Sequence, residues 1–310
     1  MVLLNSTKTV TLNDGNVINM LGLGTWQSAG NDGYDSVMAA LKAGYRHIDG
    51  AAIYKNEEQV GKAIRDSGIP REQIFVTTKL WGTQQRTPEK ALDASLKRLG
   101  LDYVDLYLMH WPVPIKSAQI QDGDYLNIPV LPSGKRDLDL EEWSFIKTWE
   151  LMQELPKTGK CKSIGVSNFS INNIKDLLAS PGNKITPAMN QVELHPLLPQ
   201  FELAQFCKEK NIYLEAYSPL GGKNAPILSE PALEEIAKKN NVSTANVVTS
   251  WIIQREIVVL PKSVTPSRII SNLQTFTLSE EDMNTISNLS KVKGEKRTVC
   301  PDWFPFTPFI

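Results

Sequence analysis

Four polar residues of this chain, Asp49, Tyr54, Lys79 and His110, together have the side chains that reduction of a carbonyl group requires. Three of them end short runs of β-branched, aromatic and aliphatic residues that are typical of buried strands, and Tyr54 follows the first run closely. A charged side chain that ends a buried strand needs a partner, because an unpaired ion there costs several kcal/mol. Their placement is therefore hard to explain by stability alone.

The chemistry that these residues suggest is proton donation to a carbonyl oxygen. Tyrosine is a weak acid with an unperturbed pKa of about 10, and a nearby ammonium group such as that of Lys79 is expected to lower it. Asp49 would keep Lys79 charged and oriented. His110 would hydrogen-bond the substrate oxygen, and Tyr54 would donate the proton as charge develops there. The reaction would still need a hydride donor.

Eight short apolar runs alternate with helix-like stretches along the chain. The strands are expected at residues 21–25, 45–49, 74–79, 104–110, 162–168, 188–191, 212–217 and 257–260. Helices are expected at residues 35–43, 57–67, 88–99, 142–155 and 201–210, the third with Thr87 as N-cap and Pro88 in its first turn. This alternation predicts a parallel sheet, and eight units predict a closed (β/α)8 TIM barrel. No boundary is visible, so residues 1–310 are expected to form one domain.

Three segments lie outside the eight units. Residues 9–18, with Asn13-Asp14-Gly15 in the middle, predict an N-terminal β-hairpin that closes the bottom of the barrel. Residues 112–139, rich in Gly and Pro and including Gly123, predict a long loop after the fourth strand, on the face where such barrels have their active sites. The tail, residues 300–309, is either a packed anchor or a flap over the substrate.

Composition limits the classes of partner. Lys and Arg number 33 against 34 Asp and Glu and are scattered, so no nucleic-acid partner is expected. Neither a signal peptide nor a membrane span is expected, which favours the cytoplasm. Cys161, Cys207 and Cys300 are far apart, as free thiols in a reducing compartment would be. Nothing suggests a symmetric apolar interface, so a monomer is expected.

Competing enzyme classes lack their motifs. Gly22-Leu-Gly24 has no third glycine for a GxGxxG loop, and no tyrosine has a lysine four residues later. Gly165-Val-Ser-Asn-Phe169 lacks the closing glycine of GxSxG, and the three histidines have no metal-ligand spacing, so no metal is expected. Taken alone, Asp49 with Lys79 would more often be a structural ion pair, and His47 and His195 are expected to be satisfied within the fold.

Motifs along nearly the whole chain resemble one known family. The segments are Gly22-Leu-Gly-Thr-Trp26, Tyr45-Arg-His-Ile-Asp49, Tyr54-Lys-Asn-Glu57, Lys79-Leu-Trp81, Leu108-Met-His-Trp-Pro112, Gly165-Val-Ser-Asn-Phe169, Asn190-Gln-Val-Glu-Leu-His-Pro196 and Pro261-Lys-Ser-Val264. They resemble the aldo-keto reductases. The resemblance implies a barrel that binds NADPH, a catalytic tetrad of Asp49, Tyr54, Lys79 and His110, and hydride transfer from the nicotinamide to an aldehyde or ketone. It also favours the flap reading of the tail.

The resemblance also implies cofactor and substrate residues. Cofactor contacts are expected from Thr25, Trp26, Ser167, Asn168, Gln191, Tyr217, Ser218, Leu220, Lys262, Ser263, Arg268 and Asn272, and substrate contacts from Trp26, Trp81, His110 and Trp111. Lys262 and Arg268 suit the 2'-phosphate of NADP, because cations with several donors bind phosphate well. Ser271 departs from the family, in which a glutamate against the adenine is common.

Substrate identity is less sharply indicated. Three segments resemble the fungal branch of the family: Asp49-Gly-Ala-Ala-Ile-Tyr54, the loop beginning Trp111-Pro-Val-Pro114, and the run from Trp149 to Lys157. That branch includes NADP-dependent glycerol dehydrogenase-like enzymes and general carbonyl reductases. Aromatic walls discriminate by only about 1–3 kcal/mol per methylene, so varied aldehydes and ketones are expected. Two alternatives stay open: an NADPH-binding sensor or regulatory subunit with incidental turnover, and a phosphate-binding isomerase.

Overall fold

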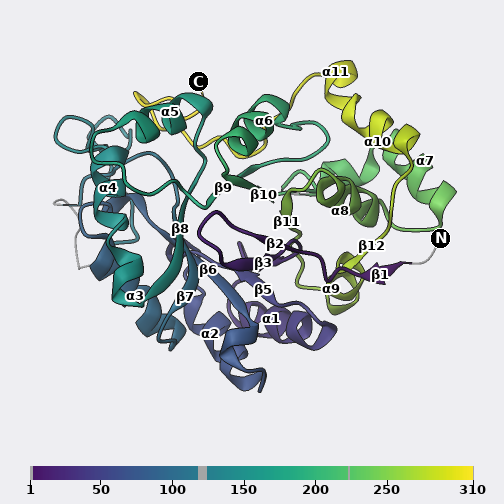
Figure 1. Ribbon diagram of the computed structural model, residues 1–310, viewed down its shortest axis with the longest axis horizontal. Helices are drawn as coiled ribbons and strands as arrows, with labels where there is room; N and C mark the ends of the chain where they lie inside the picture. Colours follow the sequence, from purple (N-terminus) through teal and green to yellow (C-terminus); the bar gives the residue numbers. More distant parts are fainter. Residues whose placement is uncertain (1–2, 118–123, 223, 310) are drawn as a thin grey trace.

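Eight parallel strands form the centre of the computed structural model, which describes residues 3–117, 124–222 and 224–309 (Figure 1). In sheet order they are β4 (Leu23–Gly24), β5 (His47–Asp49), β6 (Phe75–Leu80), β7 (Val104–Met109), β8 (Cys161–Ser167), β9 (Met189–Glu193), β10 (Tyr213–Tyr217) and β11 (Val258–Leu260). The first and last are joined by a parallel bridge between Leu21 and Val259, with Val259 N donating to Met20 O at 2.8 Å. The predicted (β/α)8 barrel is confirmed.

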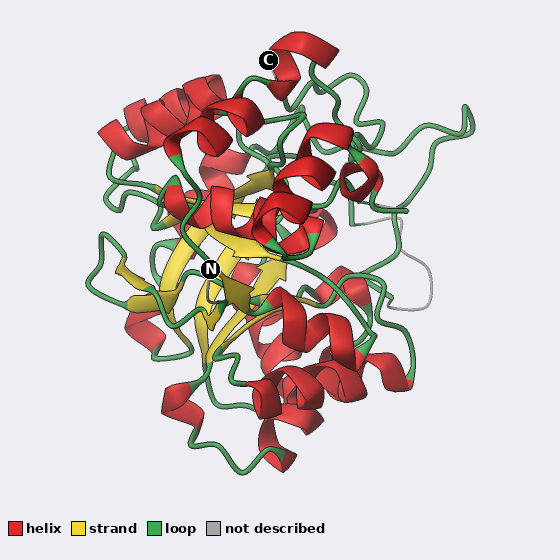
Figure 2. Ribbon diagram, turned by 90° about the vertical axis from the view of Figure 1, so that its right-hand side faces the viewer, coloured by secondary structure: helices red, strands yellow, loops and turns green. Residues whose placement is uncertain are grey.

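Helices enclose the strands on the outside, as Figure 2 shows with the strands in yellow and the helices in red. They are α1 (Asn31–Ala43), α2 (Glu57–Asp66), α3 (Pro88–Leu99), α4 (Phe145–Met152), α5 (Ile171–Ala179), α6 (Phe201–Glu209), α7 (Pro231–Asn240), α8 (Thr244–Gln254) and α9 (Pro266–Asn272), followed by α10 (Glu280–Ser287) and α11 (Leu289–Lys293). In α3, Leu92, Leu96 and Leu99 recur at helical spacing and are buried, so this face packs against the barrel.

The predicted helix at residues 142–155 is shorter in the structure. It begins at Phe145, because the Ser144 hydroxyl accepts a hydrogen bond from Lys147 N and caps the helix. It ends at Met152, before Pro156, whose ring nitrogen cannot donate to a preceding carbonyl. Thr87 lies at the N-cap of α3 as expected, but its side chain makes no capping hydrogen bond.

The N-terminal hairpin consists of β2 (Thr9–Thr11) and β3 (Val17–Asn19), paired antiparallel, as predicted. Ile18 and Leu12 are buried in one cluster with Phe75, Leu106 and Val258 from the barrel strands. The hairpin therefore closes the end of the barrel opposite the carboxyl ends of the strands. A second small sheet pairs β1 (Leu4–Asn5) with β12 (Gln274–Thr275).

The long loop and the C-terminal tail meet at the carboxyl end of the barrel. The described part of the loop folds back on itself through antiparallel bridges at Ile115–Leu138 and Val130–Arg136, whereas Gly123 lies outside the described residues. Trp303 of the tail is only 2% exposed, and its ring lies 5.5 Å from that of Trp111. The tail is therefore packed across the face where the site residues lie, as expected for a flap.

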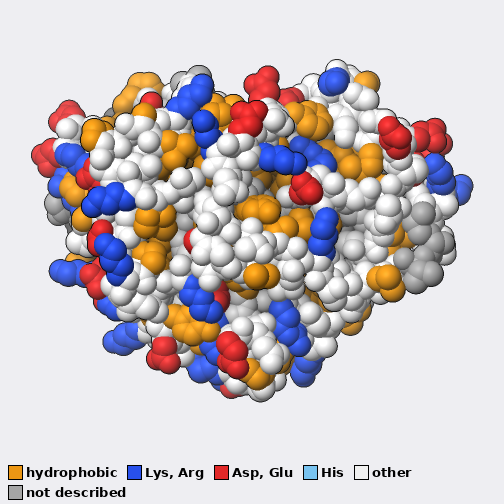
Figure 3. Space-filling model, viewed as in Figure 1, with side chains coloured by type: hydrophobic (Ala, Val, Ile, Leu, Met, Phe, Trp, Pro, Cys, Tyr) orange, Lys and Arg blue, Asp and Glu red, His pale blue; other side chains and the backbone are white. Residues whose placement is uncertain are grey.

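The surface has mixed charge. Figure 3 shows Lys and Arg interspersed with Asp and Glu over the face that it presents. Within the described part of the chain, no helix is both long enough and apolar enough to cross a membrane.

Candidate active site

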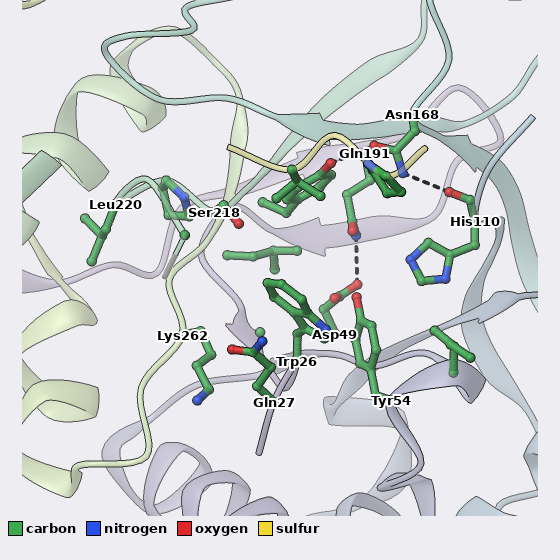
Figure 4. Close-up of a pocket in the computed structure, with 18 of the residues that line it drawn as sticks. Trp26, Gln27, Asp49, Tyr54, His110, Asn168, Gln191, Ser218, Leu220 and Lys262 are labelled. Atoms are coloured by element: carbon green, nitrogen blue, oxygen red, sulfur yellow. Dashed lines mark hydrogen bonds between the residues drawn. The ribbon is translucent and has the colours of Figure 1, made fainter. Parts of the chain in front are cut away.

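An elongated cavity of about 470 Å³ opens at the carboxyl ends of the strands. Its lining includes Gly24, Trp26, Gln27, Asp49, Ile53, Tyr54, Trp81, His110, Trp111, Asn168, Gln191, Tyr217, Ser218, Leu220, Lys262, Val299 and Pro301. Figure 4 shows Tyr54 and His110 on one side of this cavity and Lys262 and Leu220 on the other. The predicted tetrad is therefore gathered at one end, and the rest of the cavity extends away from it.

A buried ion pair lies beneath that end. Lys79 Nζ is 2.7 Å from each carboxylate oxygen of Asp49 and 2.8 Å from Gly50 O, and the Lys79 side chain is completely buried. These three acceptors use all three ammonium protons. Thr25 holds the same strand end, since its hydroxyl donates to Asp49 O at 2.8 Å.

Tyr54 follows β5 on the short helix η1 (Ala52–Tyr54), with Lys79 Nζ 5.2 Å from the centre of its ring. The expectation that Lys79 lowers the pKa of Tyr54 is wrong for this structure. Burial, then the charge of Asp49 and that of Glu215 when it is ionised, raises the pKa well above the ordinary value of 10. The charge of Lys79 does not outweigh these effects, because Asp49, which accepts two of its protons, carries the opposite charge. Tyr54 therefore retains its phenolic proton.

His110 follows β7, and its ring packs edge-on against Tyr54 and Trp81, with centroid distances of 5.8 and 5.5 Å. Burial, and then the ammonium group of Lys79, hold the pKa of His110 well below 6.5, so the imidazole is neutral near pH 7. Nδ1 is buried without a hydrogen-bond partner among the described residues. A neutral ring with its proton on Nε2 can donate one hydrogen bond to a substrate oxygen.

Three polar side chains and a tyrosine ring occupy the next strand ends. Ser167 Oγ donates to Gln191 O at 2.8 Å, and Asn168 Nδ2 donates to His110 O at 2.9 Å. Asn168 Oδ1 accepts from Tyr217 OH at 2.7 Å. Asn168 has a positive φ of 64° immediately after β8, which is an uncommon backbone conformation for a residue other than glycine. This network fixes the polar wall of the cavity.

The predicted cofactor residues divide into two groups. The cavity is lined by Trp26, Asn168, Gln191, Tyr217, Ser218, Leu220 and Lys262. The other five are not in that lining. The hydroxyl groups of Thr25 and Ser167 donate to the backbone carbonyls of Asp49 and Gln191. Ser263 Oγ accepts from Thr265 N, Arg268 is exposed on α9, and Asn272 is buried at the end of α9. The predicted substrate residues Trp26, Trp81, His110 and Trp111 all line the cavity.

The sequence analysis did not anticipate a role for the buried residues Glu193 and Glu215. Glu193, at the end of β9, binds the C-terminal tail. Its carboxylate accepts from Thr298 N at 2.7 Å, from Val299 N at 3.0 Å and from the Thr298 hydroxyl, while His195 Nε2 lies 3.2 Å away. Burial alone raises the pKa of Glu193, but the hydrogen bonds from His195, Thr298 and Val299 outweigh it and leave the pKa below its usual value. Val299 lines the cavity, so Glu193 anchors one wall of the cavity.

We expect Glu193→Gln to loosen the tail, because an amide can accept fewer of these hydrogen bonds and carries no charge. Proteolysis near residue 298 should become several-fold faster, and the KM for carbonyl substrates should rise more than the Kd for NADPH. Limited proteolysis and steady-state kinetics measure both effects. Glu235→Gln, at an exposed position on α7, is the control and should behave as wild type. Equal behaviour of the two variants would contradict the anchoring role.

Comparisons with known proteins agree with the fold and with an enzyme that reduces carbonyl groups. The family model described as "Aldo/keto reductase family" matches residues 20–291. Two proteins of Saccharomyces cerevisiae, aldehyde reductase YPR1 and glycerol 2-dehydrogenase (NADP(+)), are each 65% identical over 305 residues, covering 98% of both chains. The structure of the aldose reductase from Schistosoma japonicum superposes with a TM-score of 0.86 at 36% identity, covering 94% of both chains.

The chain thus belongs to the aldo/keto reductase family. The expectations of an oxidoreductase that reduces carbonyl groups, of NADPH as cofactor and of fungal relatives are confirmed. Across the residues that the structure describes, no three His, Cys, Asp or Glu side chains are grouped so that they could hold a metal ion. Cys161 and Cys207 are buried free thiols, and Cys300 is an exposed one.

Proposed function

We propose that Tyr54 donates the proton and His110 orients the carbonyl oxygen when this enzyme reduces an aldehyde or ketone to an alcohol. The observation that carries these assignments is the buried Asp49–Lys79 pair directly beneath the cavity end that Tyr54 and His110 line. Burial of two charged side chains costs desolvation free energy. Such a pair next to an open cavity that a protonated tyrosine lines is typical of a functional site.

Each side chain has a separate role in the proposed mechanism. NADPH, when bound, supplies the hydride to the carbonyl carbon. His110, neutral and with its Nε2 proton available, donates a hydrogen bond to the carbonyl oxygen and aligns it with the Tyr54 hydroxyl. As negative charge develops on that oxygen, it becomes basic enough to take the proton from Tyr54. The fixed Lys79 ammonium then stabilises the phenolate that is left.

The side chains of the elongated cavity fit a nicotinamide dinucleotide. Asn168, which accepts a hydrogen bond from Tyr217 OH, and Gln191 line the cavity near the proposed proton donor, and Lys262 lies at the opposite end. Amides pair with the carboxamide of nicotinamide, an aromatic ring offers a stacking face, and a cation suits phosphate. We assign Ser263, Arg268 and Asn272 to the phosphate and adenosine end of the same ligand.

Replacement of both Lys262 and Arg268 by alanine should weaken NADPH far more than NADH. Each charged contact to phosphate is worth about 1.5–3 kcal/mol, so loss of two should raise the KM for NADPH roughly 100-fold or more while NADH changes little. Steady-state kinetics with both cofactors measure this difference. Lys291→Ala, at an exposed position on α11, is the control. Equal losses for both cofactors would overturn the phosphate assignment.

For the substrate, we propose a broad range of aldehydes and ketones. Trp26, Trp81 and Trp111 supply apolar walls that fit varied side groups, and the two yeast relatives are named for aldehydes and for glycerol. NADPH consumption with glyceraldehyde, an aromatic aldehyde and a keto ester tests this range. Turnover of all three supports it, and turnover of only one would replace it with a narrow specificity.

We further propose that residues 1–310 act as one domain and as a cytoplasmic monomer. The strands of the barrel are drawn from residues 23 to 260, and the tail returns to the active-site face, which favours one folding unit. Light scattering on the purified protein tests the monomer, and a mass near twice 34.6 kDa would contradict it. Microscopy of a tagged chain in yeast cells tests the compartment.

A further inference from the structure

A second carboxylate is buried beneath the proposed active site. Glu215, in the middle of β10, has no exposed surface, and its Oε2 accepts a hydrogen bond from Gln191 Nε2 at 2.7 Å. The same Gln191 nitrogen donates to Asp49 Oδ2 at 2.8 Å. Glu215 thus lies one hydrogen-bonded residue away from the Asp49–Lys79 pair, yet neither proton donation nor orientation of the carbonyl uses it.

The two carboxylates fix the orientation of the Gln191 amide. Both protons on Nε2 point at carboxylate oxygens, and a flipped amide would turn its carbonyl oxygen against the same two acceptors. The carbonyl oxygen is therefore the only hydrogen-bonding atom of the Gln191 side chain that is left for a ligand. Gln191 lines the cavity, so this acceptor is available there.

On its other side, Glu215 faces a histidine. His47 Nδ1 is 3.2 Å from Asn19 O, and a carbonyl can only accept, so Nδ1 carries a proton. His47 Nε2 lies 3.5 Å from Glu215 Oε1, and neither atom has a hydrogen-bond partner among the described residues. A neutral imidazole and an ionised carboxylate would place two lone pairs against each other. A proton on one of the two atoms removes this repulsion.

The His47 ring has no room to turn away from Glu215. It packs edge-on against Phe75 at a centroid distance of 5.3 Å, and a Cβ at Gly22 would lie 2.5 Å from its Nδ1. The proton is thus held in a fixed geometry. Burial lowers the pKa of His47 to about 4, and burial, then the charge of Asp49, raises the pKa of Glu215 to about 8, so near neutral pH the proton resides on Glu215.

We propose that Glu215 is a positioning residue, which shares one proton with His47 and holds the Gln191 carbonyl oxygen toward the cavity as an acceptor for the carboxamide of NADPH. This inference rests on the proposed cofactor site. With the proton in place, Glu215 and His47 are both neutral, and among the described residues the buried charges near Tyr54 are those of Asp49 and Lys79. Loss of the proton adds a negative charge that opposes formation of the Tyr54 phenolate.

The variants Glu215→Leu and Glu215→Gln separate positioning from support of the barrel. Leucine removes one of the two acceptors, so the Gln191 amide is held less firmly, and the Kd for NADPH should rise about tenfold. The Kd for 2'-phospho-ADP-ribose, which has no nicotinamide, should stay within twofold of wild type. Glutamine can accept from Gln191 and donate to His47, as the protonated glutamate does, and should restore NADPH affinity. Fluorescence titration of each purified variant measures these constants.

A pH profile supplies the second readout. The charged or titratable groups around Glu215 are His47 and Asp49 from β5, Lys79 from β6 and Tyr54 from η1. The wild-type kcat for carbonyl reduction should fall above pH about 8 as Glu215 loses its proton. In Glu215→Gln this decline should be absent. The profile needs no leucine variant, so it tests the inference even if Glu215→Leu does not fold.

Several results would overturn the inference. These are unchanged NADPH affinity in folded Glu215→Leu, equal loss of both ligands in that variant, failure of glutamine to restore NADPH affinity, or the same alkaline decline in wild type and Glu215→Gln. If wild type itself failed to bind NADPH, the proposed cofactor site would fail instead, which distinguishes the two cases.

Discussion

Tyr54→Phe should lower kcat for carbonyl reduction by about 10³-fold and leave the Kd for NADPH within twofold of wild type. A positioned general acid contributes about 10²–10⁴-fold, and phenylalanine removes only the hydroxyl that donates the proton. The raised pKa of Tyr54 means that this proton is present throughout the neutral range. Steady-state kinetics and a fluorescence titration with NADPH measure both quantities.

Tyr103→Phe is the matched control for this experiment. Tyr103 lies just before β7, at the end of the barrel away from the cavity, and stacks with Arg71. Its loss of a hydroxyl should leave kcat unchanged. A Tyr54→Phe enzyme that turned over within tenfold of wild type would show that another group supplies the proton.

Lys79→Met should abolish activity and also destabilise the fold. Removal of one partner leaves the Asp49 carboxylate buried without its cation, which costs about 3–5 kcal/mol. Addition of Asp49→Asn should recover much of that free energy, because the double variant no longer buries a net charge. Activity should not recover, since Tyr54 would still lack the ammonium group that stabilises its phenolate. Urea unfolding and kinetics on the three proteins separate the two effects.

The exposed ion pair between Lys62 and Asp66 on α2 provides the comparison. Lys62→Met removes a lysine with little burial, so the urea midpoint should not change measurably. If Lys79→Met shifted the midpoint no more than Lys62→Met does, the pair beneath the cavity would not be the costly buried pair that we describe.

The barrel and the gathering of Asp49, Tyr54, Lys79 and His110 at one face could be predicted because their signals are local. Each strand is a short apolar run, and Asp49, Lys79 and His110 lie at the ends of such runs, so parallel strands bring them to the same face. The motifs that resemble the family then identify Tyr54 and the amides Asn168 and Gln191. None of this requires knowledge of which residues meet across the barrel.

The remaining features depend on distant contacts and could not be predicted. Glu193 and Glu215 stand out as carboxylates within apolar strands, but the partner of Glu193, Thr298, lies 105 residues away. The pKa of Tyr54 was predicted in the wrong direction for the same reason. Sequence already pairs Lys79 with Asp49, whereas only the structure shows that Tyr54 is buried and that a second carboxylate, Glu215, lies near it.

The most direct test of the central claim uses NADPH that carries two deuterium atoms at C4 of the nicotinamide, with glyceraldehyde as substrate and mass spectrometry of the product. We predict that the alcohol gains one deuterium on the former carbonyl carbon with wild type and very little with Tyr54→Phe in the same time. NADPH binding without any labelled alcohol from any carbonyl tested would contradict the reductase mechanism and favour an NADPH-binding sensor.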